Sequence, residues 1–234
     1  MGLENLKNII ADSENIVFFG GAGVSTESGI PDFRSDAGIF KEEYKYPAET
    51  ILSHSFFNKK TKDFYDFYRN RMIFLEAKPN AAHNFLAELE KADKLKTVVT
   101  QNIDGLHQMA GSQNVIELHG SIHRNYCKKC NEFYDIQAIL SAEDIPYCNC
   151  GGIIKPDVIL YEEALSNRVI ESAINYISNA EVLIIGGTSL AVYPAAGLIN
   201  YYKGNKLVLI NKTATPMDNK ANFVFHGSIG EILK

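Results

Sequence analysis

The segment from Ile16 to Arg34 constrains the fold of this chain most strongly. It begins with four apolar residues, Ile16–Phe19, which are typical of a short buried strand. Three glycines follow within four positions, and glycine lets a backbone come close to a bulky polar ligand. Ser25 and Thr26 are suitable N-cap residues, so we expect a helix to begin there with its free N–H groups facing that ligand. Strand, glycine turn and helix start together predict a phosphate cradle, and a tight turn without a ligand is the alternative.

This segment differs from the ordinary dinucleotide-binding fingerprint. Counting the pattern G-x-G-x-x-G from Gly21 places Thr26 where the last glycine should be. No second strand ending in an acidic residue follows about 20 positions later. Gly29–Pro31 should also cut the helix short, because proline lacks an N–H and its ring clashes with the preceding turn. We therefore expect the loop at 32–34 to contact the ligand itself.

Composition narrows the class of protein. A chain of 234 residues with 46% hydrophobic content can form one large domain with a small insert. The net charge of −5 argues against general nucleic-acid binding. No signal-peptide pattern opens the chain, so we expect a cytoplasmic protein. The apolar run Val182–Ile199 is long enough to suggest a membrane span, but glycines and Pro194 interrupt it, so we interpret it as strand, loop and helix.

Four later apolar runs are each followed by polar residues. Helical patterns separate several of these runs, which predicts an α/β fold with a parallel sheet covered on both faces. In such sheets the ligand crevice lies at the carboxyl ends of the strands. We expect one cleft to collect the glycine loop and the residues that follow the strands: Gln101–Asp104, His119, Thr188, Ser189 and Asn211.

Taken together, these segments resemble the sirtuin family of NAD-dependent protein deacylases, of the bacterial type. The matching stretches follow the family's order over nearly the whole chain. They are Gly21–Ser25, Gly29–Arg34, Thr100–His107, Glu117–Gly120, Lys155–Asp157 and Gly187–Leu190.

The resemblance implies a Rossmann-like parallel sheet with a small zinc-binding insert and a helical module. The NAD-binding domain would comprise 1–35, 79–120 and 156–234, the helical module with its cofactor loop 36–78, and the zinc domain 121–155. The implied NAD contacts are Ala22, Thr26, Phe33 and Arg34 in the glycine loop; Gln101, Asn102, Ile103 and Asp104 on the nicotinamide side; and Thr188, Ser189 and Asn211 on the phosphate and adenosine-ribose side.

The resemblance also implies a reaction. NAD serves as co-substrate and its nicotinamide is expelled, while the carbonyl oxygen of an acyl-lysine attacks C1′ of the ribose. The acyl group ends on ADP-ribose, so the products are nicotinamide, O-acyl-ADP-ribose and a free lysine. The partners would be acylated-lysine proteins or peptides, with no nucleic acid and no membrane. Mono-ADP-ribosyl transfer to a protein and a non-enzymatic NAD-sensing module are the alternatives.

The reaction needs a general base near the ribose hydroxyls. Histidine suits this task because its unperturbed pKa, about 6.5, lies close to working pH. His119 follows an apolar run at its carboxyl end and precedes Gly120, which permits close approach; a structural hydrogen bond is the alternative. The family match favours His119 as the catalytic residue and gives His107 an orienting role. Asp104 and Asp32 could orient the carboxamide or a water, or could simply cap turns.

Four cysteines fall in one local cluster. Cys127 and Cys130 have the spacing of a zinc half-site, because two intervening residues let both thiolates reach one tetrahedral ion. Cys148 and Cys150 are one residue closer than the family's usual pair. A disulfide is the alternative, which the missing export signal disfavours. Four thiolates fill a tetrahedral site, so we expect one structural zinc ion.

Glu162 is a departure from the family pattern, which commonly has glycine there. The resemblance implies that the segment Lys155–Glu163 and the loop after Ser189 hold the substrate peptide as an added strand. A glutamate at this position restricts the backbone and adds negative charge. Our hypothesis from the sequence is a preference for basic flanking residues in the substrate.

Overall fold

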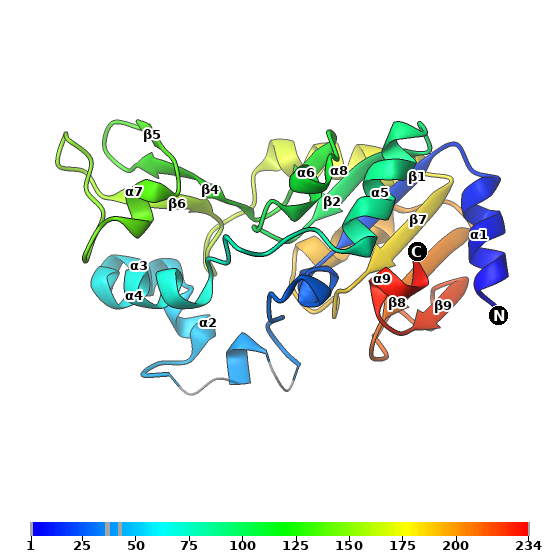
Figure 1. Cartoon of the computed structure of the whole chain (residues 1–234), viewed down its shortest axis with the longest axis horizontal. Helices are drawn as coiled ribbons and strands as arrows, with labels where there is room; N and C mark the ends of the chain where they lie inside the picture. Colours follow the sequence, from blue (N-terminus) through cyan, green and yellow to red (C-terminus); the bar gives the residue numbers. More distant parts are fainter. Residues whose placement is uncertain (1, 36–37, 42–43, 234) are drawn as a thin grey trace.

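The structure is a computed structural model that describes residues 2–35, 38–41 and 44–233. Positions 36–37 and 42–43 of the predicted helical module lie outside the described residues. Figure 1 shows two lobes side by side. The larger lobe is built on one sheet and contains both ends of the chain, and the smaller lobe combines a short sheet with a group of helices.

A six-stranded sheet forms the centre of the larger lobe, in the order β3-β2-β1-β7-β8-β9. All of its pairings are parallel, which confirms the predicted fold class. Buried apolar side chains fill β1 and β7 completely, as expected for strands covered on both faces. The strands are β1 Ile16–Gly20, β2 Leu95–Thr100, β3 Val115–Glu117, β7 Val182–Gly186, β8 Lys206–Asn211 and β9 Phe223–His226.

Helices cover both faces of this sheet (Figure 1). Successive side chains of β1 point to opposite faces, so Phe18 lies in one apolar cluster and Phe19 in the other. The Phe18 side is packed by α1 Leu3–Ala11, α5 Ala81–Lys91 and α9 Ile229–Ile232, and α6 Leu106–Ala110 lies beside α5. The Phe19 side is packed by α8 Asn167–Asn179 and the 3₁₀ segment η4 Ala195–Tyr201.

The smaller lobe joins two predicted segments in one core. Its antiparallel sheet has the order β5-β4-β6. Phe57, Phe64 and Tyr65 of the helical segment pack in the same cluster as Ile139 and Ile154 of the cysteine-containing segment. The elements are α2 Ala48–Ile51, α3 His54–Lys59, α4 Thr61–Arg71, β4 Gly120–Cys127, β5 Phe133–Tyr134, α7 Gln137–Leu140 and β6 Ile154–Val158.

The glycine segment differs from the prediction, because no α-helix follows it. Two 3₁₀ turns, η1 Ala22–Val24 and η2 Thr26–Ser28, take the place of the expected helix. The Ser25 hydroxyl does not cap either turn; it donates to Asp104. Gly29 then leaves the second turn in the left-handed conformation, with φ +84°, which ends it before a helix can form.

The run Val182–Ile199 forms β7, a loop and the start of η4, as interpreted from the sequence. Within the described part of the chain, no helix has both the length and the hydropathy that crossing a bilayer would require.

Two histidines are buried against each other between α5 and α6. The ring centroids of His83 and His107 are 4.7 Å apart, and both side chains are almost fully inaccessible. His83 Nδ1 accepts a hydrogen bond from the Asn80 backbone N–H at the start of α5. Burial lowers the pKa of His83 to about 4 and that of His107 to about 3. Both imidazoles are therefore neutral in the folded protein near neutral pH.

This histidine pair should make the fold sensitive to acid. In the unfolded chain these imidazoles bind protons once the pH falls below about 6.5. In the folded chain they bind protons only when the pH falls to about 4 for His83 and about 3 for His107. The unfolded state then carries more protons, so the free energy of unfolding decreases as the pH is lowered. The loss is about 2 kcal/mol for each histidine at about pH 5. Denaturant unfolding across this pH range measures the loss. The variant His226→Gln, which removes an exposed histidine, should keep the same slope, and a flat profile would contradict the prediction.

Candidate active site

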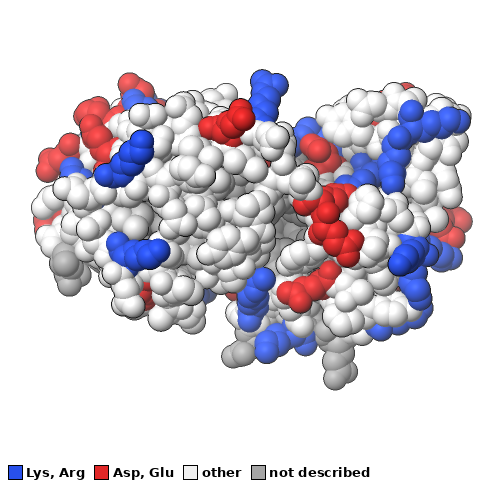
Figure 2. Space-filling view, turned by 180° about the vertical axis from the view of Figure 1, so that it is seen from behind, with Lys and Arg blue, Asp and Glu red and all other residues white. Residues whose placement is uncertain are grey.

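A cavity of about 670 Å³ lies where the carboxyl ends of the strands meet the smaller lobe. Figure 2 shows the hollow between the two lobes, with Asp and Glu side chains along one of its rims. Every predicted cofactor-binding residue lines this cavity, and so does His119: the set is Ala22, Thr26, Phe33, Arg34, Gln101, Asn102, Ile103, Asp104, Thr188, Ser189 and Asn211.

Two glycine turns pack against each other at the base of the cavity. The Gly21 N–H donates to the carbonyl of Gly186 at 3.2 Å, and the Gly23 N–H donates to the carbonyl of Gly187 at 2.8 Å. A Cβ atom on Gly23 would lie 2.8 Å from the backbone of Gly187, which itself has φ +58°. Gly23 and Gly187 are therefore required for the contact between the turns after β1 and β7, whether or not a ligand is bound.

A hydrogen-bonded trio connects the glycine segment to the end of β2. The Ser25 hydroxyl donates to Asp104 Oδ2 at 2.6 Å, and Asn102 Nδ2 donates to the Ser25 oxygen at 3.1 Å. Asp104 Oδ1 also accepts from the backbone N–H of Leu106, so this aspartate holds the start of α6 as well. Ser25 lines the cavity and was missed as a site residue. Its place inside the glycine motif was the signal that could have identified it.

The other polar residues of the cavity also contact one another. Gln101 Nε2 donates to Thr188 Oγ1 at 3.1 Å, which joins the ends of β2 and β7. Asp32 Oδ1 accepts from the backbone N–H groups of Arg34 and Ser35, so this carboxylate shapes its own turn. Asn211 donates its amide to the Thr213 carbonyl at 2.8 Å. A side-chain contact thus joins the ends of β2 and β7, whereas Asp32 and Asn211 each stabilise their own local turn.

His119 occupies the junction between β3 and β4. Its Nδ1 lies 3.0 Å from the carbonyl oxygen of Gln101. A carbonyl only accepts hydrogen bonds, so Nδ1 carries the proton and Nε2 keeps its lone pair. Burial lowers the pKa of His119, and the bond to Gln101 only partly opposes this effect. The imidazole is therefore held neutral with one nitrogen able to accept a proton.

The glycine after His119 serves a purpose other than ligand approach. Gly120 has φ +78°, and a Cβ atom there would lie 1.8 Å from the carbonyl oxygen of Asp157. The close approach is to strand β6. A second histidine, His123, places Nε2 3.1 Å from the Asp104 carbonyl and was also missed as a neighbour of the site.

The four cysteines form one compact cluster in the smaller lobe. The sulfur atoms of Cys127, Cys130, Cys148 and Cys150 all lie within 4.8 Å of one another, and none of the four is in a disulfide. The donor set fits one zinc ion, because four thiolates complete a tetrahedral shell and leave no position for a substrate. The short spacing between Cys148 and Cys150 is compatible with this site, because both sulfurs lie within the same cluster.

Fold and cavity together define a Rossmann-like protein with a dinucleotide-sized cleft beside a small four-cysteine domain. The profile of the Sir2 family matches residues 21–194. The chain belongs to the Sir2 family.

Similar proteins agree with this assignment. An "NAD-dependent protein deacetylase" of Clostridium tetani is 61% identical over 98% of this chain and 95% of that protein. One of the same name from Clostridium acetobutylicum is 59% identical over 99% of this chain and 96% of that protein. A solved structure of "Sir2-p53 peptide-NAD+" has a TM-score of 0.89 and 37% identity, and covers 100% of this chain and 96% of its own.

The cysteine cluster leads to a prediction about metal content. The purified protein should contain one zinc ion per chain, and Cys148→Ser should lose it and unfold at a lower temperature, because metal binding contributes directly to folding of such domains. Elemental analysis and thermal unfolding measure the two effects. Asn149→Ala, which changes only the residue between two ligands, should keep its zinc. Zinc content that survives Cys148→Ser would contradict the assignment.

Proposed function

We propose that this chain is an NAD-dependent protein deacylase that removes acyl groups, acetyl among them, from lysine side chains. The observation that carries the proposal is the convergence of His119 with the glycine segment and the polar strand ends on one cavity. A histidine with a free Nε2 beside a dinucleotide-sized cleft suits proton removal from a sugar hydroxyl. The activity named for the clostridial relatives supports the same reaction.

The proposed position of NAD follows the chemistry of the cavity wall. Gly21 and Gly23 line the cavity and would lie beside the pyrophosphate, with Thr188, Ser189 and Asn211 on the phosphate and adenosine-ribose side. Ala22, Thr26, Phe33 and Arg34 would cover the dinucleotide from the other side. Gln101, Asn102, Ile103 and Asp104 would surround the nicotinamide, where the rigid trio of Ser25, Asn102 and Asp104 can orient its carboxamide.

The proposed reaction breaks the bond between nicotinamide and C1′ of the ribose. The carbonyl oxygen of the acyl-lysine then bonds to C1′, and His119 Nε2 accepts the proton of a ribose hydroxyl that attacks the acyl carbon. The Gln101 carbonyl accepts the Nδ1–H bond throughout and stabilises the imidazolium that forms. Water completes the balance: NAD, acyl-lysine and water give nicotinamide, O-acyl-ADP-ribose and lysine.

The proposal keeps the division into an NAD-binding domain, a helical module and a zinc domain. The four cysteines would hold a structural zinc that fixes the smaller lobe, and cysteines that are not joined in disulfides suit a reducing compartment such as the cytoplasm. Acylated proteins or peptides are the proposed partners. A solved structure named "Sir2 bound to acetylated peptide", 37% identical to this chain, supports this class of substrate.

Incubation with NAD and acetyl, propionyl or succinyl peptides tests the proposal. We expect nicotinamide and O-acyl-ADP-ribose in equal amounts, and we expect His119→Ala to lower turnover by at least about a hundredfold, the usual contribution of a general base. His226→Ala, which changes an exposed histidine, is the matched control. Addition of ADP-ribose to a protein target would instead identify a transferase, and NAD binding without nicotinamide release would identify a sensing module.

The protonation state of His119 predicts the pH profile. The base is active when neutral, and burial lowers its pKa below the ordinary 6.5. Activity should therefore stay high down to pH 6.5 and fall only as the pH drops through the lowered pKa. The measurement is kcat/KM for the peptide, which reports groups of the free enzyme, between about pH 5 and pH 9. An acid limb centred above pH 6.5 would contradict this prediction.

A further inference from the structure

The segment 159–163 forms one wall of the cavity and is attached to His119. Its five residues all line the cavity. At its first residue, the Ile159 N–H donates to the carbonyl oxygen of His119 at 3.0 Å. This bond connects the wall to the backbone of the proposed base.

The same segment is attached at its third residue, Tyr161, to the helices of the smaller lobe. The Tyr161 N–H donates to the Leu52 carbonyl and the His54 N–H donates to the Tyr161 carbonyl, both at 2.9 Å. These two bonds form a parallel bridge between Ser53 and Tyr161 at the start of α3. The wall thus runs from His119 to α3.

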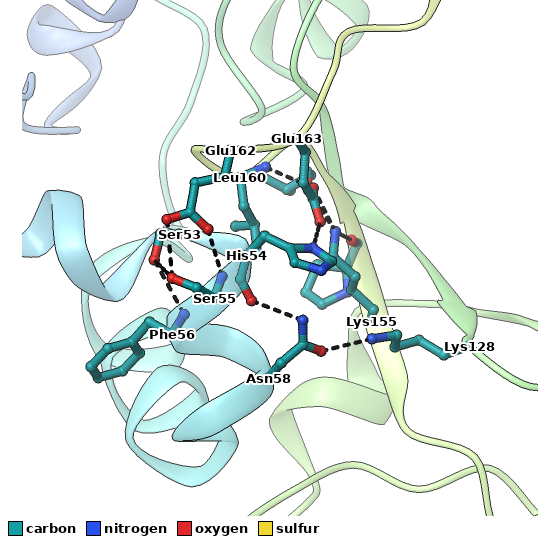
Figure 3. A network of polar contacts seen from close by, with 12 residues as sticks. Ser53, His54, Ser55, Phe56, Asn58, Lys128, Lys155, Leu160, Glu162 and Glu163 are labelled. Atoms are coloured by element: carbon teal, nitrogen blue, oxygen red, sulfur yellow. Dashed lines mark hydrogen bonds and ion pairs between the residues drawn. The ribbon is translucent and has the colours of Figure 1, made fainter.

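Glu162 fastens this wall with its side chain. Its carboxylate accepts from the backbone N–H of Ser55 at 2.8 Å and from the Ser55 hydroxyl at 3.0 Å (Figure 3). The backbone of Glu162 has φ +74°, a conformation that favours glycine and is strained for other residues. Glycine would relieve the strain at this position, and the glutamate that stands there instead makes two bonds to Ser55.

Glu163 and α3 complete the attachment. Glu163 accepts from Lys155 Nζ at 3.1 Å and from the Leu160 N–H at 2.9 Å, and its other oxygen lies 2.9 Å from His54 Nδ1. Figure 3 shows these contacts beside those of Glu162. The wall is therefore held to α3 by both of these adjacent carboxylates.

The helix α3 is itself held from the cysteine cluster. Lys128, which lies between two of the cysteines in sequence, donates to Asn58 Oδ1 at 3.0 Å and stands 5.1 Å from the centre of the Phe57 ring. Asn58 in turn donates to the His54 carbonyl at 3.0 Å. A continuous chain of contacts runs from the zinc-binding turn through α3 to the cavity wall (Figure 3).

We infer that Glu162 is a positioning residue for the acyl-peptide: by binding Ser55, its carboxylate holds the segment 159–163 in the peptide-binding position beside His119. The inference rests on the proposed function, because it requires that an acyl-peptide substrate binds along this wall. It differs from the hypothesis of charge recognition, because the carboxylate is bonded to Ser55 of α3, and the two hypotheses predict different results for basic and acidic peptides. A wall that is already ordered before binding improves affinity, because ordering costs nothing at the moment of binding.

Three variants test the inference. Glu162→Gly removes the carboxylate and relieves the strain. Glu162→Gln keeps an oxygen that can accept from the Ser55 N–H. Asp93→Gly is the matched control, because Asp93 is also an acidic residue at positive φ, and its side chain is exposed and paired only at the surface with Lys96. The readouts are KM for an acetyl-lysine peptide with basic flanks and one with acidic flanks, KM for NAD, kcat and the thermal midpoint.

We expect Glu162→Gly to raise the peptide KM about fivefold for both peptides, as it would if the wall were in position only about a fifth of the time. KM for NAD should not change, and the thermal midpoint should fall no further than in Asp93→Gly. Glu162→Gln should stay within about twofold of the parent, since it keeps one accepted bond. Ser55→Ala should raise the peptide KM in the parent and should have no added effect in Glu162→Gly.

Two results would overturn the inference. One is an unchanged peptide KM in Glu162→Gly. The other is an equal rise in Glu162→Gln and Glu162→Gly for the basic peptide alone, which would indicate charge recognition. Hydrogen exchange of the free protein provides a readout independent of activity: amides of 159–163 should exchange faster in Glu162→Gly than in the parent or in Asp93→Gly. If the parent protein has no deacylase activity but these amides still exchange faster in Glu162→Gly than in the parent, the role of Glu162 in holding the wall is supported and the proposed function is rejected, so the two failures are distinguishable.

Discussion

The register of the parallel sheet is the constraint on which the rest of the structure depends. Gly20 at the end of β1 pairs with Thr100 at the end of β2 and with Gly186 at the end of β7. Three strands far apart in the sequence therefore end at one level, and the polar residues that follow them meet. A shift of the register would separate Ser25 from Asp104 and Gln101 from Thr188, which are the contacts that form the cavity wall.

The second lobe closes the cavity because it is joined firmly to the edge of the sheet. Arg124 donates to Glu117 at 2.7 Å and to Asp157 at 2.9 Å, so one guanidinium connects β3, β4 and β6. Gly120 lets β6 approach at the same point. His119 lies between these contacts, which places the proposed base at the junction of the two lobes. Two of the four clustered cysteines, Cys127 and Cys148, are part of the core of this lobe.

Burial of uncharged imidazoles is a common feature of the region around the cavity. Desolvation lowers the pKa of His119, and more strongly those of His83 and His107, which lie between α5 and α6. The same burial has two consequences. It keeps the proposed base in the form that can accept a proton, and it makes the fold dependent on those groups staying neutral.

Local pattern was enough to predict the parallel sheet and its strands, the cysteine cluster and the set of residues around the cavity, because strand period, glycine turns and cysteine spacing depend on neighbours in the chain. The strands β4 and β5 of the smaller sheet were not predicted. The resemblance to a known family supplied the roles. Other features depended on contacts between distant segments. Ser25 was expected to cap a helix, but its hydroxyl donates a hydrogen bond to Asp104, 79 positions away. Glycine is required at position 120 because the backbone of Asp157 lies so close, and the Glu162 carboxylate accepts a hydrogen bond from Ser55. Only the tertiary structure decides such pairings, because a side chain's partner is set by what folding brings within hydrogen-bonding distance.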